Sequence, residues 1–219
     1  MTSAPILLHH ARVPAALDPA LQARWLAALP AAQAARVERM HRVSDRAASL
    51  LGIALLLDCA RTAGLDAPSS RSLVFPGQGK PAWSSGPDFS ISHCAGRVGC
   101  ALAPAETRLG LDIEQRGAAT DAALRLVTSS GERSLYAASG LTADDLWTAK
   151  EAVLKAAGMA AAQAGEVSLA VDTATLRGRL YFLSRLHVAA DSSCTLAATH
   201  PAGVTVAEVD AGPLLEGVD

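Results

Sequence analysis

The stretch from Leu146 to Gly158, LWTAKEAVLKAAG, constrains the fold most, because it predicts a helix with charges beside its buried face. Apolar side chains recur every three or four positions, as on one face of a helix. They are Leu146, Ala149, Val153 and Ala156. Glu151 and Lys155 lie one turn apart on another face, with Lys150 beside them. This pattern alone fits an exposed face with one ion pair as well as it fits a chemical site.

A pair of acidic residues lies upstream, in LGLDIEQ at positions 109–115. Apolar residues alternate there with the others, which is the period of a strand, so Asp112 and Glu114 point to one face. Two carboxylates on one strand face can converge on a cation, and oxygen ligands suit Mg²⁺ when a substrate supplies phosphate oxygens. An exposed strand face would show the same pattern, so this motif also leaves two interpretations open.

Composition narrows the classes of function. The 219 residues suffice for one large or two small domains, and the net charge of −2 argues against a general nucleic-acid binder. The longest apolar run, near Leu50 to Leu57, is shorter than the roughly 18 residues that span a bilayer. The start MTSAPILLHHARV lacks the pattern of a signal peptide, and the four cysteines lack C-x-x-C spacing. We therefore expect a cytoplasmic protein with reduced thiols and with neither nucleic-acid nor membrane partners.

The first half of the chain predicts a strand, three helices and a hairpin. The strand covers 5–13, two helices begin after Asp18 and Pro30, a third and most apolar helix covers 44–63 with Ser44 as a plausible cap, and the hairpin strands cover 89–94 and 97–103. Arg46 and Ser49 lie near the start of the third helix, where backbone N–H groups and side-chain donors suit a phosphate. Arg36 belongs to a basic cluster over 31–43, which is either a solvated helix face or an anion site.

The second half predicts helices over 117–140, then the helix that begins near Leu146, and then a loop after Gly158. From Val167 onward the alternation predicts an antiparallel sheet. Because both halves combine helices with strands, we expect an α+β fold of two lobes, residues 1–104 and 105–219, with a cleft between them.

A nucleophile pair of Ser92 and His93 is one interpretation of the segment FSISHC. Adjacent residues on a strand point to opposite faces, so one cannot readily activate the other. The chain also lacks a G-x-S-x-G nucleophile turn. This argues against serine-based hydrolysis.

Four motifs in order carry a family resemblance. They are GKP at 79–81, F-x-I-S-H at 89–93, G-x-D-I-E at 110–114 and W-T-x-K-E-A-x-x-K at 147–155. Together they resemble the Sfp-type 4′-phosphopantetheinyl transferases, over roughly Pro30 to Gly158. DR-x-x-SL-x-G at 45–52 and ATHP at 198–201 are also similar.

The resemblance implies that the phosphopantetheine arm of coenzyme A is transferred to a serine of an apo acyl or peptidyl carrier protein. Adenosine 3′,5′-bisphosphate would be released. It also implies two similar α+β lobes related by a pseudo-twofold axis, with coenzyme A between them, and we expect a monomer. One alternative is a non-catalytic scaffold of this fold that binds coenzyme A or carriers. Another is an unrelated Mg²⁺-dependent phosphoester hydrolase.

The resemblance further implies roles for single residues. Asp112, Glu114 and Glu151 would bind Mg²⁺, with Glu151 also the base and Lys155 stabilising charge on the pyrophosphate. The implied coenzyme A-binding residues are Arg36, Arg46, Ser49, Lys80, Ser92, His93, Lys150 and Lys155. Carrier recognition is expected within Gln115 to Leu146. Ser90 and Cys94 depart from the family pattern, which often has Asn and Ser or Thr at these positions.

Overall fold

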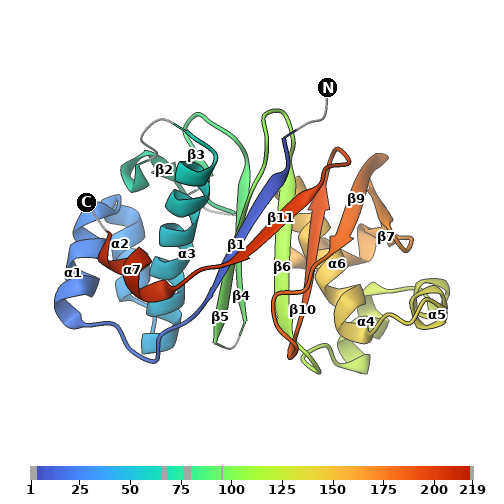
Figure 1. Cartoon of the computed structure of the whole chain (residues 1–219). Helices are drawn as coiled ribbons and strands as arrows, with labels where there is room; N and C mark the ends of the chain where they lie inside the picture. The colour runs from blue at the N-terminus through green and yellow to red at the C-terminus, as the bar shows by residue number, and fades with distance from the viewer. Residues whose placement is uncertain (1–3, 66–68, 76–79, 95, 218–219) are drawn as a thin grey trace.

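The computed structural model describes residues 4–65, 69–75, 80–94 and 96–217, which form two main sheets, each packed against a long helix (Figure 1). The helices are α1 (Pro19–Ala28), α2 (Ala31–Glu38), α3 (Val43–Thr62), α4 (Asp121–Val127), α5 (Ser130–Ala138), α6 (Ala143–Ala157) and α7 (Ala211–Glu216), with the 3₁₀ helices η1 (Ser70–Ser72) and η2 (Ala161–Glu166). None of these described helices has the length and apolar character needed to cross a membrane.

Most of the strands come in two runs along the chain, one before α4 and one after η2. They are β1 (Ile6–Arg12), β2 (Leu73–Val74), β3 (Ala82–Trp83), β4 (Phe89–Cys94), β5 (Arg97–Leu102), β6 (Leu109–Gln115), β7 (Ser168–Leu169), β8 (Thr173–Leu176), β9 (Arg179–Arg185), β10 (Ser192–Ala198) and β11 (Val204–Glu208). The α+β class predicted from the sequence is confirmed.

The first sheet has the order β11-β1-β5-β4, in which β1, β5 and β4 run antiparallel and β11 runs parallel to β1. The helix α3 packs against β1 and β5. Its residues Leu50, Leu51 and Leu55 are fully buried. The helix predicted over 44–63 is therefore present as α3, which begins and ends one residue earlier.

The second sheet has the order β6-β10-β9-β8-β7 and is antiparallel throughout. The helix α6 packs against β6 and β10 and buries Leu146, Val153 and Leu154. Each sheet thus receives a long helix between its first strand and its later strands. The pseudo-twofold relation itself stays a prediction.

The two sheets meet along β4 and β6, which belong to different sheets but contact each other extensively. Alternate side chains on and just before β4 accept hydrogen bonds from alternate backbone N–H groups of β6. The pairs are Asp88 with Leu109, Ser90 with Leu111 and Ser92 with Ile113, at 2.9, 3.0 and 3.2 Å. We call these three contacts the β4–β6 seam. The seam satisfies N–H groups on an edge strand that would otherwise lack partners.

The end of the chain differs from the prediction. We expected all strands after Val167 in the second lobe, but β11 pairs with β1 and α7 packs against α3 (Figure 1). The Trp25 indole N–H fixes α7 by donating to the Leu215 carbonyl at 2.8 Å. A second difference is η2, which lies within the segment predicted as a loop after Gly158. The division of the chain into two lobes at residue 104 therefore stays a proposal. β11 and α7 are exceptions to it, because they pack with the first lobe.

Candidate functional site

A cavity of about 320 Å³ opens where β4, β6 and α6 meet. It is lined by Ile91, Ser92, His93, Asp112, Glu114, Trp147, Glu151, Lys155 and Ala161. Six residues that the sequence singled out therefore share one cavity, although they lie as far apart in the chain as Ser92 and Lys155. A larger cavity of about 910 Å³, next to Trp83 and Arg108, has none of those six in its lining.

Local sequence rules explain why α6 presents its charges to this cavity. The Thr142 side chain accepts the Asp145 N–H and starts the helix, and Gly158 ends it in the left-handed conformation. Glu151 and Lys155 are four residues apart, so they lie on one face. Trp147 is one turn before Glu151 on the same face and also lines the cavity. Trp147 also packs against the core beneath α6, and its i, i+4 spacing to Glu151 is the sequence signal for its place in the cavity lining.

Asp112 is the central acid of the cavity and is 3% exposed. Its Oδ1 accepts hydrogen bonds from the Lys155 ammonium at 2.6 Å and from the Ser92 hydroxyl at 3.2 Å. Its Oδ2 is buried and has no hydrogen-bond partner among the residues that the structure describes, and the same is true of Glu151 Oε1. Buried carboxylate oxygens without a partner are costly, so this site favours an additional cation.

The charges of the side chains that line the cavity also favour a bound cation. Burial, followed by the Asp112 carboxylate, raises the pKa of Glu151. Burial and then Asp112 also raise the pKa of Glu114, on which Glu151 acts in the same direction. Three carboxylates thus face one ammonium group, that of Lys155. The oxygen donors and their excess negative charge fit a hard divalent cation such as Mg²⁺.

The carboxylates are not yet arranged as a complete metal centre. In the described part of the chain, no three or more His, Cys, Asp or Glu side chains are grouped closely enough to hold a metal ion. The Lys155 ammonium provides the counter-charge to Asp112 in this arrangement. The three-ligand set of Asp112, Glu114 and Glu151 therefore stays a prediction.

Among the basic residues of the first half, His93 on β4 lines the cavity, whereas Arg36 on α2 and Arg46 on α3 do not. Burial and the Lys155 charge lower the pKa of His93, and Asp45 and Arg36 also act on it. Arg46 donates from Nη1 to the Met40 carbonyl at 3.0 Å, while its Nε is buried without a hydrogen-bond partner.

The remaining polar residue of this group is half-buried. Ser49, one turn after Arg46 on α3, has intermediate exposure. Arg36 on α2 is exposed. Arg36, Arg46 and Ser49 therefore lie outside the residues that line the cavity, and their contacts with coenzyme A stay predictions.

Lys80, which the resemblance implied as a coenzyme A contact, does not line the cavity and is bonded to protein groups. Its ammonium donates to Asp88 Oδ2 at 2.7 Å and to the Leu109 carbonyl at 2.6 Å. It therefore clamps the start of β4 to the start of β6, at one end of the β4–β6 seam. Burial lowers the pKa of Lys80, and Asp88 opposes that shift. Gly79, the first residue of the GKP motif, lies outside the described residues.

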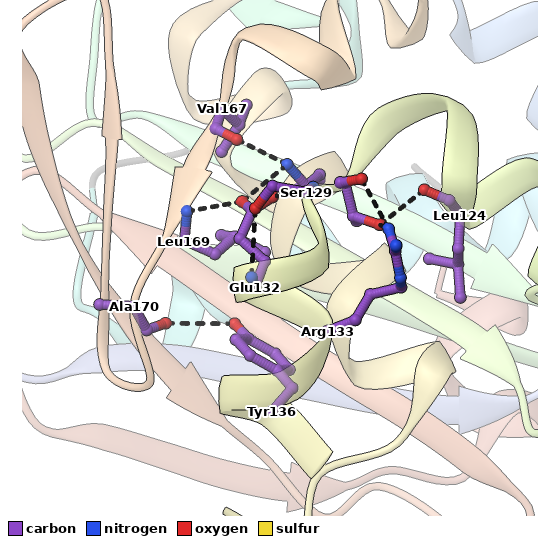
Figure 2. Close-up of polar contacts among 10 residues, drawn as sticks. Leu124, Ser129, Glu132, Arg133, Tyr136, Val167, Leu169 and Ala170 are labelled. Carbon is purple, nitrogen blue, oxygen red and sulfur yellow. Dashed lines mark hydrogen bonds and ion pairs between the residues drawn. The ribbon is translucent and has the colours of Figure 1, made fainter. Parts of the chain in front are cut away.

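Lys150 does not join the cavity, which corrects our expectation of a coenzyme A contact. Its side chain is 1% exposed and donates to Glu132 Oε1 at 3.0 Å and to the Val167 carbonyl at 2.6 Å. Figure 2 shows Glu132 within this group, where it also accepts from the backbone N–H groups of Ser129 and Leu169. Successive helix residues differ by about 100° in direction, so Lys150 points away from the face of Glu151.

This same part of the chain is similar to known proteins. The family model described as the 4′-phosphopantetheinyl transferase superfamily matches residues 108–205, which include β6 and α6. A curated protein, 4′-phosphopantetheinyl transferase Svp of Streptomyces mobaraensis, is 37% identical over 92 residues. The alignment covers 38% of this chain and 37% of that protein, so the chain matches little more than a third of the relative's length.

Proposed function

We propose a function for this chain from its cavity and from its similarity to the 4′-phosphopantetheinyl transferase superfamily over residues 108–205. The proposed reaction transfers the 4′-phosphopantetheine arm of coenzyme A to a serine hydroxyl of an apo acyl or peptidyl carrier protein. Adenosine 3′,5′-bisphosphate is the leaving product. The observation that carries the proposal is the cavity that collects Asp112, Glu114, Glu151 and Lys155 within the part matched by the family.

The acidic residues have two proposed tasks. Asp112, Glu114 and Glu151 would hold Mg²⁺, which when bound neutralises the pyrophosphate and orients it for displacement. Glu151 would also accept the proton of the carrier serine, directly or through water. Support for both tasks comes from the buried oxygens Asp112 Oδ2 and Glu151 Oε1, which have no hydrogen-bond partner.

The basic residues would hold the nucleotide. Lys155, at the cavity, would stabilise negative charge on the pyrophosphate. Arg36, Arg46, Ser49 and His93 would bind the 3′-phosphate and adenine end from the side of α2 and α3. The buried Arg46 Nε without a partner supports this role, because a guanidinium N–H gains most from a charged acceptor.

The carrier protein would dock near α4 and α5, which lie within the segment Gln115 to Leu146. Leu126 on α4 is 85% exposed and offers an apolar contact there. α4 contacts η2, whose Ala161 lines the cavity, so this surface lies next to the proposed reaction centre.

Intact mass spectrometry of a carrier protein tests the proposal. The apo carrier is incubated with the protein, coenzyme A and Mg²⁺, and a gain of one phosphopantetheine group is expected. Glu151→Gln should abolish the gain, whereas Glu166→Gln, the same change at an exposed surface ion pair with Arg177, should retain it. Release of phosphopantetheine without a carrier would instead indicate a hydrolase. Coenzyme A binding without transfer to carriers of any class would indicate a scaffold.

A further inference from the structure

The hydroxyl of Ser92 contacts the backbone of β6, Asp112 and Lys155 at the same time. It accepts the Ile113 N–H at 3.2 Å and the Lys155 ammonium at 3.0 Å, and it donates to Asp112 Oδ1 at 3.2 Å. The residue is 5% exposed. Ser92 therefore links the strand backbone, the central acid and the lysine of α6.

These three contacts use the whole hydrogen-bonding capacity of a serine hydroxyl, which has one donor and two acceptor lone pairs. A further hydrogen bond from the Ser92 side chain to coenzyme A would require one of the three to break. The family resemblance implied that Ser92 grips coenzyme A, but its side chain is already fully occupied by protein groups.

We propose that Ser92 is a positioning residue that holds Asp112 Oδ1 and the Lys155 ammonium, and thereby leaves Asp112 Oδ2 free for a divalent cation. Both groups bind Oδ1, so Oδ2, which has no partner among the described residues, is the oxygen available to a cation. The inference rests on the proposed function, since it assigns a cation to this carboxylate. Groups that orient a metal ligand through hydrogen bonds strongly affect cation affinity.

Ser90 provides a matched control on the same strand. It points to the same face, is 0% exposed and accepts the Leu111 N–H at 3.0 Å, so it forms the neighbouring contact of the seam. In the described part of the chain, its hydrogen bonding involves the β6 backbone and neither Asp112 nor Lys155. Ser90→Ala thus removes a seam contact while leaving the carboxylate hydrogen bonds in place.

The test compares Ser92→Ala with Ser90→Ala in the full chain, with Mn²⁺ as the probe. Mn²⁺ binding is measured by electron paramagnetic resonance, stability by thermal unfolding, and transfer by kcat and KM for coenzyme A. Both variants should lower Tm, because each leaves one β6 N–H without an acceptor. Only Ser92→Ala should weaken Mn²⁺ binding, by about tenfold or more, and lower kcat, with KM for coenzyme A changed by less than about twofold. Ser92→Thr keeps the hydroxyl and should restore Mn²⁺ affinity.

Three results would overturn the inference. They are equal Mn²⁺ affinities for the two alanine variants, a wild-type protein that binds no Mn²⁺, and a raised KM for coenzyme A with unchanged kcat in Ser92→Ala. The last result would indicate that the Ser92 side chain binds coenzyme A. If the wild-type protein modifies no carrier, the proposed function fails, while Mn²⁺ affinity and Tm still decide the role of Ser92.

Discussion

Gly110 on β6 lies directly against the backbone of Ala152 on α6. A Cβ atom at position 110 would lie 2.1 Å from the Ala152 carbonyl oxygen and 2.5 Å from the Ala156 nitrogen. Both are helix backbone atoms, which cannot move aside as a flexible side chain can. This close approach brings Lys155 to within 2.6 Å of Asp112, two residues further along β6. Gly110 is therefore what allows the helix charges and the strand charges to share one cavity.

We predict that Gly110→Ala lowers the free energy of unfolding by at least about 1–3 kcal/mol, since an added methyl group has no space there. Transfer activity should fall as well, because α6 must move away from β6. Urea unfolding measures the first effect and the carrier assay the second. Gly165→Ala is the control, since a Cβ at position 165 meets open space. Equal stability of the two variants would refute the role assigned to Gly110.

A second prediction concerns the buried ion pair of Lys150 and Glu132 (Figure 2). Glu132→Gln replaces the carboxylate beside the buried Lys150 ammonium with a neutral amide. The ammonium keeps the Val167 carbonyl as an acceptor but loses its counter-charge. Breaking one side of a buried pair should reduce the free energy of unfolding by about 3 kcal/mol. Lys150→Met is the companion variant, and it should leave the affinity for coenzyme A near the wild-type value. A large loss of coenzyme A affinity with wild-type stability would place Lys150 in the binding site after all.

The same pair predicts how stability changes in acid. Burial alone would raise the pKa of Glu132, but the N–H groups of Ser129 and Leu169 and the Lys150 ammonium outweigh it and hold the pKa below its ordinary value of 4.5. A carboxylate with a lowered pKa in the folded state stabilises the fold above its unfolded pKa and loses this contribution as pH falls through the folded pKa. The stability difference between wild type and Glu132→Gln should therefore shrink as pH drops below about 4.5. Urea unfolding across a pH series measures it, and a constant difference would contradict the assignment.

The site was predictable where it depends on local periodicity. The period of two in LGLDIEQ placed Asp112 and Glu114 on one face, and the period of 3.6 placed Glu151 and Lys155 together. The partners of Lys150 were not predictable, because they depend on how α5 and the segment after η2 pack beside α6. The parallel pairing of β11 with β1 was equally hidden, since alternation predicts a strand but not its partner.

Lys80 has two possible roles that an experiment can separate. In the structure it joins the starts of β4 and β6, whereas the resemblance implies that it contacts coenzyme A. Its ion pair with Asp88 is buried on both sides, with side-chain exposures of 13% and 7%. We predict that Lys80→Met and Asp88→Asn each destabilise the fold, and that their effects are non-additive by about 1–3 kcal/mol in a double-mutant cycle. Denaturant unfolding of the four proteins gives this coupling. Additive effects together with a raised KM for coenzyme A in Lys80→Met would favour the contact instead.

Arg46 tests the proposed nucleotide grip. Its partner-free Nε and its place on the first turns of α3 suit an anion, and the 3′-phosphate of coenzyme A is the proposed one. Arg46→Gln should weaken binding of coenzyme A by about tenfold, the value of one charge-assisted hydrogen bond. Dephospho-coenzyme A lacks the 3′-phosphate, so its affinity should change little. Isothermal titration of both ligands measures the two constants, with Arg125→Gln on the exposed face of α4 as the charge-matched control. If both ligands lose affinity equally, Arg46 acts on the fold of α3, because a direct phosphate contact must discriminate between them.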